Sequence, residues 1–161
     1  MLKKTFIILC SIIILIGLFW IISKRFDAYN FEKASTSCDT ITVINEEIIL
    51  YFKDFKHDDI EKINLRIRRD GKFVKDTTLL NNVSCNSVES SYCSFYLNQT
   101  KIYRKDTIYL TTANQKTYTI NGFDYFVSEH YGMFGSLGDY YCNFFDEFII
   151  NGKRTNQIIN K

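Results

Sequence analysis

Residues 63–80 read INLRIRRDGKFVKDTTLL, and this stretch indicates the fold more strongly than any other. Ile63, Leu65 and Ile67 alternate with polar residues, which is the pattern of a strand with one buried face. Asp70 and Gly71 then form a pair that accepts the positive φ angles of a tight turn. Residues 72–80 can return as the partner strand, so we expect an antiparallel hairpin here.

Short strand patterns recur through the rest of the chain at spacings of about 8–12 residues. They are predicted at residues 40–52, 92–97, 107–111, 116–120, 123–128 and 140–150. Turn signals lie between or after them, at residues 45–47, 113–115, 121–122 and 151–152. Many short strands joined by tight turns are typical of an all-β fold. We predict an antiparallel β-sandwich of Ig-like architecture.

The N-terminal part of the chain has a different character. Residues 5–22 read TFIILCSIIILIGLFWII and carry no charge. At 1.5 Å per residue, a helix of this length spans roughly 27 Å, close to the thickness of the bilayer hydrocarbon core. Trp20 lies near its end, where an amphipathic ring suits the membrane interface. The sequence therefore predicts one N-terminal transmembrane helix.

The sequence also bears on whether this apolar segment stays as a membrane anchor or is cleaved as a signal peptide. A cleaved signal peptide has a shorter apolar run followed by a small-x-small site, and no such site follows Ile22. Leu9 precedes Cys10, so a lipoprotein signal, which places a small residue there, is not indicated. We expect an uncleaved anchor with a membrane-buried Cys10 thiol. A cleaved signal is the alternative.

Four cysteines remain after Cys10, namely Cys38, Cys85, Cys93 and Cys142. An even number spread over the chain is typical of disulfides in an oxidising compartment. Zinc ligation usually needs closer pairs, and four buried thiols are a further alternative. We favour the pairs Cys85–Cys93 and Cys38–Cys142. This pairing implies that the C-terminal part is extracytoplasmic, in a bacterial periplasm or at the cell surface.

We expect three parts: a transmembrane anchor at 1–23, a polar juxtamembrane spacer at 24–37 and a β-sandwich domain at 38–161. The net charge is +2. Lys3 and Lys4 account for it, because the other 18 basic residues balance the 18 acidic ones. A neutral domain does not favour binding to nucleic acid or another polyanion.

Signals for catalysis or cofactor binding are weak. His57 with Asp58 and Asp59 could bind a cation, but a solvated turn explains them equally well. His130 beside Glu129 could serve a hydrolase, although no nucleophile motif accompanies it. Three glycines, at 132, 135 and 138, lie where we expect a hairpin loop rather than a phosphate cradle. We predict no catalytic residue, no cofactor and no metal.

Aromatic residues are concentrated between residues 123 and 148, where ten of 26 residues are aromatic. Adjacent aromatics in a strand point to opposite faces, so one core cannot cover them all. Exposed tyrosine and phenylalanine beside a glycine-rich loop are typical of a recognition surface, although the loop could instead fold over them. The predicted binding residues are Tyr131, Phe134, Tyr140, Tyr141 and Phe144.

In layout the chain resembles small bacterial cell-envelope β-domain proteins. The shared features are the N-terminal apolar segment, the strand-rich domain and a late cysteine before a closing strand with Asn-Gly. This resemblance transfers no functional residue. We predict a membrane-anchored extracytoplasmic module that binds a protein partner, of an immunity or envelope-accessory type. A hydrolase using His130, or a glycan-binding module using exposed aromatics, is the alternative.

Overall fold

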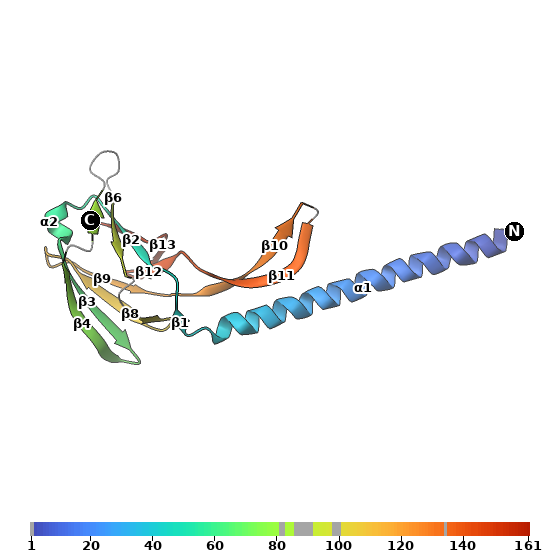
Figure 1. Ribbon diagram of the computed structural model, residues 1–161, viewed down its shortest axis with the longest axis horizontal. Helices are drawn as coiled ribbons and strands as arrows, with labels where there is room; N and C mark the ends of the chain where they lie inside the picture. The colour runs from blue at the N-terminus through green and yellow to red at the C-terminus, as the bar shows by residue number, and fades with distance from the viewer. Residues whose placement is uncertain (1, 81–82, 86–91, 98–100, 134) are drawn as a thin grey trace. The chain divides into compact units, whose positions relative to one another are not determined.

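The chain forms two compact units. The computed structural model describes residues 2–80, 83–85, 92–97, 101–133 and 135–161, with side chains described from Phe6 onward except at 135–137. One unit, which we call the stem, comprises Met1–Thr40 and Phe126–Asn143. The other, which we call the body, comprises Ile41–Tyr125 and Phe144–Lys161 (Figure 1).

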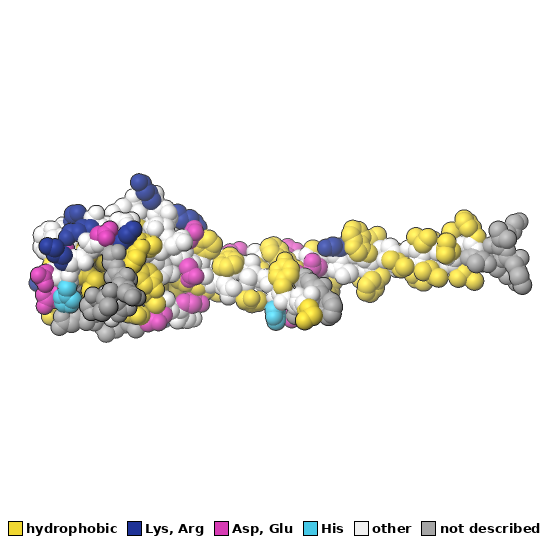
Figure 2. Space-filling model, turned by 90° about the horizontal axis from the view of Figure 1, so that it is seen from above, with side chains coloured by type: hydrophobic (Ala, Val, Ile, Leu, Met, Phe, Trp, Pro, Cys, Tyr) yellow, Lys and Arg dark blue, Asp and Glu magenta, His cyan; other side chains and the backbone are white. Residues whose placement is uncertain are grey.

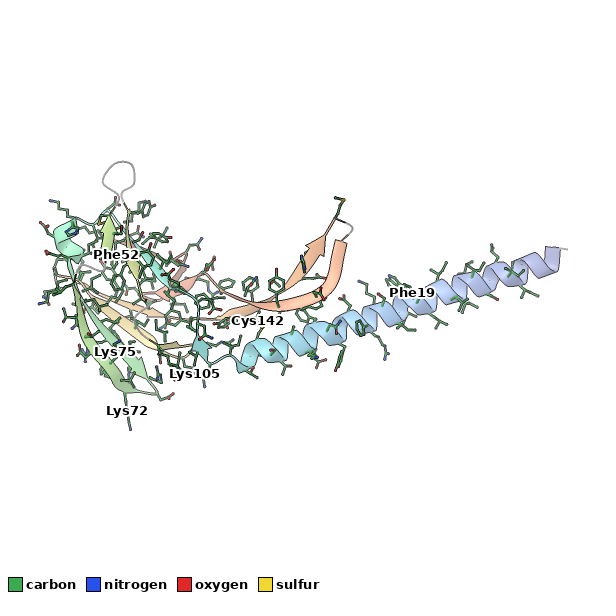
Figure 3. The ribbon with its side chains drawn as sticks, in the orientation of Figure 1. Phe19, Phe52, Lys72, Lys75, Lys105 and Cys142 are labelled. Carbon is green, nitrogen blue, oxygen red and sulfur yellow. A yellow bond between two sulfur atoms is a disulfide. The ribbon has the colours of Figure 1, made fainter. Side chains whose placement is uncertain are left out.

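Helix α1 (Leu2–Thr40) forms most of the stem. Among the described residues it is the helix that is long and apolar enough to cross a membrane, by length and composition. Its apolar side chains are exposed, as at Phe19, which is 74% exposed and projects away from the helix (Figure 3). Figure 2 shows hydrophobic side chains along this helix, whereas charged side chains gather on the body.

The helix extends much further than predicted. Residues 24–37, the expected spacer, are helical up to Thr40. No proline or glycine interrupts the chain between Leu18 and Thr40, so nothing in the backbone ends the helix. The hydroxyl of Thr36 donates to the carbonyl of Glu32 at 2.9 Å, one turn earlier. Ser and Thr hydroxyls can bond within a helix in this way, which makes a polar Ser-Thr-Ser segment compatible with it.

The hairpin of β10 (Tyr125–Gly132) and β11 (Gly135–Phe144) completes the stem. The hairpin loop expected to hold the glycines at 132, 135 and 138 is wrong, because β10 continues to Gly132 and β11 begins at Gly135. The glycines are accommodated within the strands. Gly138 has φ +71°, a conformation that allows an irregularity in a strand without ending it.

The body contains two larger sheets. Six strands in the order β13-β12-β9-β8-β3-β4 form one sheet, and four in the order β14-β2-β6-β5 form the other. All pairs are antiparallel except β14–β2, which is parallel. The strands are β2 (Ile49–Lys53), β3 (Lys62–Arg69), β4 (Lys72–Leu80), β5 (Val83–Cys85), β6 (Tyr92–Tyr96), β8 (Thr107–Thr111), β9 (Thr117–Asn121), β12 (Phe148–Ile150), β13 (Lys153–Thr155) and β14 (Ile158–Asn160).

Three short elements complete the body. Strands β1 (Val43–Ile44) and β7 (Ile102–Tyr103) pair with each other, and α2 (His57–Ile60) is a single turn of helix. The β-rich fold with one long apolar N-terminal helix is confirmed. The Ig-like arrangement is not, since each sheet of the described residues is open and the β14–β2 pair is parallel.

The predicted hairpin of residues 63–80 is confirmed. Strands β3 and β4 pair antiparallel around Asp70 and Gly71, with φ angles of 47° and 81°. Ile63, Leu65 and Ile67 are fully buried, as their alternation predicts. They share one hydrophobic cluster with side chains of the four-stranded sheet, including Leu50, Phe52 and Phe95. The two sheets therefore cover one common core, within which Phe52 is labelled in Figure 3.

Candidate functional site: the β10–β11 hairpin

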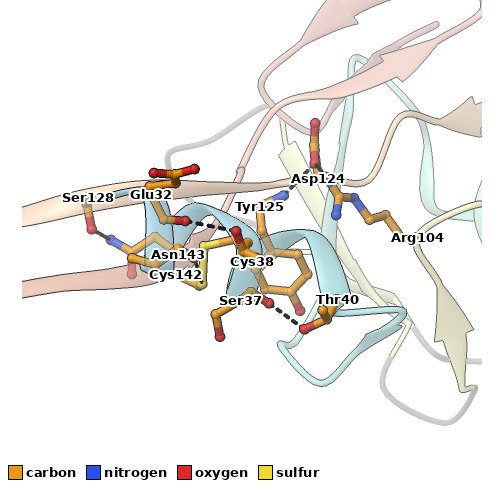
Figure 4. The surroundings of a disulfide bond; sticks show 12 residues. Glu32, Ser37, Cys38, Thr40, Arg104, Asp124, Tyr125, Ser128, Cys142 and Asn143 are labelled. Carbon is orange, nitrogen blue, oxygen red and sulfur yellow. Dashed lines mark hydrogen bonds and ion pairs between the residues drawn. A yellow bond between two sulfur atoms is a disulfide. The ribbon is translucent and has the colours of Figure 1, made fainter. Parts of the chain in front are cut away.

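The hairpin is fastened to α1 by a few specific contacts. Cys142 of β11 forms a disulfide with Cys38 of α1, with 5.5 Å between their Cα atoms (Figure 4). Two residues earlier in β11, the Tyr140 hydroxyl donates to Asp27 at 2.6 Å. The Tyr140 ring meets Phe31 edge to face at 5.6 Å. The disulfide is the pair favoured from the sequence, and it fixes β11 against the polar part of α1.

Strand alternation gives the hairpin two different faces. Tyr140 approaches Glu129 at 3.4 Å, so these two residues share the face toward α1. Asn143 donates to Ser128 at 2.8 Å on the opposite face (Figure 4). Tyr141 belongs to the face of Asn143 by alternation. We call this the outer face and define it by Phe126, Ser128, His130, Tyr141 and Asn143.

Large side chains remain exposed on this hairpin. Phe126 is 42% exposed and Tyr141 47%, both on the outer face. At the turn, Tyr131 is 68% and Met133 94% exposed. We call these last two residues the hairpin tip. No residue of the stem with a described side chain is buried except Cys38, so the stem has no hydrophobic core that could absorb them.

The predicted binding residues fall in different environments. Tyr141 and Tyr131 are exposed, on the outer face and at the tip respectively. Tyr140 is half-buried against α1. Phe144 belongs to the body, where it packs against the core beside Phe148. Phe134 lies outside the described residues. The structure thus places Tyr131, Tyr140 and Tyr141 in the stem part of the hairpin, whereas Phe144, the last residue of β11, lies in the body.

Two exposed residues were not among those predicted, namely Phe126 and Met133. Phe126 belongs to the aromatic run counted in the sequence, but only the strand register shows that it shares a face with Tyr141. Met133 was assigned to a loop. An apolar residue between two glycines, at 132 and 135, is the signal that could have marked it as the end of a hairpin.

Acidic neighbours raise the pKa of two tyrosines on the helix-facing side of the hairpin. The hydrogen bond to Asp27 raises the pKa of Tyr140, and burial and the nearby Glu129 add to this effect. A hydrogen bond with Glu129 likewise raises the pKa of Tyr131, with a smaller contribution from Asp27. The Tyr140 hydroxyl therefore stays a protonated donor and links β11 to Asp27 of α1 and to Glu129 of β10.

A groove of about 430 Å³ lies between α1 and β11 within the stem. It is lined by Asn30, Lys33, Ala34, Ser37, Gly138, Asp139, Tyr140, Tyr141 and Cys142. Lys33 and Asp139 supply opposite charges, and the rest of the lining is small or aromatic. No histidine is among these lining residues, and Tyr141 borders the groove as well as the outer face.

The histidines occupy exposed positions. His130 lies exposed on the outer face and lines no part of the groove. His57 is exposed at the start of α2. Nearby, the carboxylate of Asp59 accepts from the Lys56 backbone N–H at 3.0 Å and pairs with Lys161, and these contacts lower its pKa. No cluster of metal-ligating side chains occurs among the described residues.

The basic residues of β3 have structural partners. Arg69 donates to both oxygens of the buried Asp106 at 2.7 Å and stacks on the Tyr103 ring at 3.6 Å. Arg66 pairs with Asp76 at 3.3 Å across β3 and β4. These contacts account for Arg66 and Arg69 without a ligand.

Comparison with known proteins gives no relative. No protein-family model matches the chain, and neither the curated proteins nor the solved structures include a significant match.

Proposed function

We propose that this chain is a single-pass membrane protein with an extracytoplasmic body and stem, and that its hairpin binds a protein partner without catalysis. The observation that carries the proposal is the outer face of the hairpin. Phe126 and Tyr141 are 42% and 47% exposed there, beside the polar residues Ser128, His130 and Asn143. Aromatic anchors surrounded by hydrogen-bonding groups are typical of protein-binding surfaces.

The proposed extracytoplasmic location is supported by α1 and by the cysteines. Residues 5–22 are long and apolar enough to span a bilayer, and two disulfides join the cysteines that follow. Disulfides persist in oxidising compartments, which favours a bacterial periplasm or cell surface. Intact-mass measurement of the protein from native membranes tests retention of the anchor. Loss of the first 20 or so residues would overturn the anchor in favour of a cleaved signal.

For the body we propose a β-sandwich of Ig-like type. Support comes from the single core to which both larger sheets contribute, for example Leu65 from β3 and Phe95 from β6. The parallel β14–β2 pair is the feature that departs from the antiparallel sheets of an Ig-like domain. An experimental structure of the body in which the two sheets do not face each other would overturn this description.

Partner binding is testable with a photo-crosslinker placed on the outer face in the native membrane. We expect a discrete protein adduct from position 141 and from position 126. Phe73 is the matched control, because it is a 52% exposed aromatic on β4 of the body. Equal adducts from positions 73 and 141, or none from 141 and 126, would overturn the assignment of this surface.

A further inference from the structure

We propose that the hairpin tip, Tyr131 and Met133, enters the headgroup layer of the membrane that α1 crosses. The inference rests on the proposed anchoring by α1 and adds a second point of membrane contact. The occupant of this surface is lipid. The protein partner proposed above concerns the outer face, which is a different set of residues.

The hairpin runs along α1 toward the N-terminal, apolar part of the helix. Cys142 is bonded to Cys38, and Tyr140 reaches Asp27 and Phe31. Moving from Cys142 to Tyr140 along β11 therefore moves toward the N-terminal, apolar part of the helix. The turn of the hairpin continues in that sense, as the β10–β11 ribbon in Figure 1 shows.

The distances place the tip near the apolar boundary. Asp27 follows Ile22, the last residue of the apolar run, by five residues, or about 7.5 Å of helix. The headgroup layer on each side of a bilayer is roughly 5–7 Å thick. Tyr131 lies close enough to Asp27 for the carboxylate to help raise its pKa. Met133 lies two residues beyond Tyr131, in the turn that follows β10, and so at most about 7 Å further along the chain.

The chemistry of the tip suits an interface. Residues 131–138 carry no charge, whereas His130 and Asp139 flank them. Tyr131 and Met133 are 68% and 94% exposed, so both are available. Tyrosine is enriched where the hydrocarbon core meets the headgroups. On α1, Lys24 and Arg25 follow the apolar run after Ser23, where cationic side chains can meet lipid phosphates.

Tryptophan fluorescence in lipid vesicles tests the inference with the full chain. Trp20 is the single native tryptophan, so Trp20→Phe provides a silent background. Met133→Trp and Tyr131→Trp then report on the tip, and Phe126→Trp is the matched control on the same hairpin. Phe126 is seven residues from Met133, roughly 23 Å along an extended strand. The vesicles contain phosphatidylcholine and phosphatidylglycerol, with or without a lipid that carries a quencher on its headgroup.

We expect Met133→Trp to lose about half of its emission to the headgroup quencher and to shift to the blue, as interfacial indoles do. Phe126→Trp should lose much less. Quenching of positions 133 and 131 no greater than that of position 126 would overturn the tip contact, and a tip occupied by protein would give that result. Equal strong quenching at all three positions would also overturn it, because the whole hairpin would then lie on the membrane.

A measurement on the native protein distinguishes a wrong tip contact from a wrong membrane anchor. Trp20 should be quenched by lipids brominated on their acyl chains. If Trp20 is quenched while the tip is not, anchoring stands and the tip contact is wrong. If Trp20 is not quenched, the proposed anchoring itself is wrong. Non-reducing mass mapping of Cys38–Cys142 confirms that each variant keeps its fold, and positions 131 and 133 serve as independent reporters.

Discussion

The body and the stem are stabilised in different ways. In the body, side chains from both larger sheets form one buried cluster that includes Phe52, Phe95 and Phe148. In the stem, the hairpin is held to α1 by the Cys38–Cys142 disulfide, one tyrosine hydrogen bond and one ring contact. Burial of apolar area stabilises the first, whereas a covalent link and polar contacts stabilise the second. Large apolar side chains therefore lie exposed on the hairpin, as at Met133, whereas those in the core of the body are buried and costly to truncate.

Truncation of a core residue should give the largest difference between the units. Phe95 is fully buried, and Phe95→Ala should destabilise the body by about 3–5 kcal/mol, since it leaves a cavity. Met133→Ala at the hairpin tip should change the free energy of unfolding by less than about 0.5 kcal/mol. Urea unfolding in detergent micelles, followed by circular dichroism, measures both. Similar losses in the two variants would contradict the distinction between body and stem.

Loss of the buried ion pair should have the next largest effect. Asp106→Asn removes the charge that holds Arg69 and should cost about 2–3 kcal/mol. We place this below the range for fully buried pairs because the Arg69 side chain is 27% exposed. Asp76→Asn is the matched control, since Asp76 and Arg66 are 60% and 44% exposed. It should cost below about 1 kcal/mol. Equal costs would mean that Asp106 does not stabilise the body through Arg69.

The two disulfides should affect different units. Cys38→Ser with Cys142→Ser should raise amide hydrogen exchange in the hairpin and in the last turns of α1, while exchange in the body stays unchanged. Cys85→Ser with Cys93→Ser should do the reverse and destabilise the body by about 2.5 kcal/mol, the chain-entropy value for a short loop. Mass spectrometry of exchanged peptides resolves both regions. Exchange that rises throughout the chain in either variant would contradict two separately stabilised units.

Local signals in the sequence were sufficient to predict many of the strands and turns of the body. The alternation of Ile63, Leu65 and Ile67 and the Asp70-Gly71 pair specify a hairpin by themselves, because register and turn type are decided within 18 residues. The strand at Thr107–Thr111 was predicted at its observed bounds for the same reason.

The stem could not be predicted in the same way. Residues 24–37 lack an apolar stripe, yet they continue the helix of the preceding segment, and propagation of an existing helix needs no stripe. For the candidate site, the excess of aromatics was visible in the sequence. The separation of Tyr140, which faces α1, from Tyr141, which is exposed, depends on which strand face meets the helix. That face is determined by the contact between Tyr140 and Asp27, which are 113 residues apart in the sequence.

High pH should affect the two units differently. Burial, together with the hydrogen bond to Glu46, raises the pKa of Tyr125 from 10.0 to about 12. Between these two values the unfolded chain releases this proton while the folded body keeps it. The stability of the body should therefore fall as the pH rises from 10 to 12. Tyr125→Phe should make the urea midpoint less sensitive to pH over this interval.

Tyr140→Phe is the matched variant in the stem. Its hydroxyl also has a raised pKa, chiefly because it donates to Asp27, so the substitution removes a contact that fastens the hairpin to α1. We expect faster amide exchange in the hairpin and no change in the alkaline response of the body. If Tyr140→Phe flattened the response of the body as Tyr125→Phe does, the stability of the body would depend on the hairpin contact. The two units would then unfold as one.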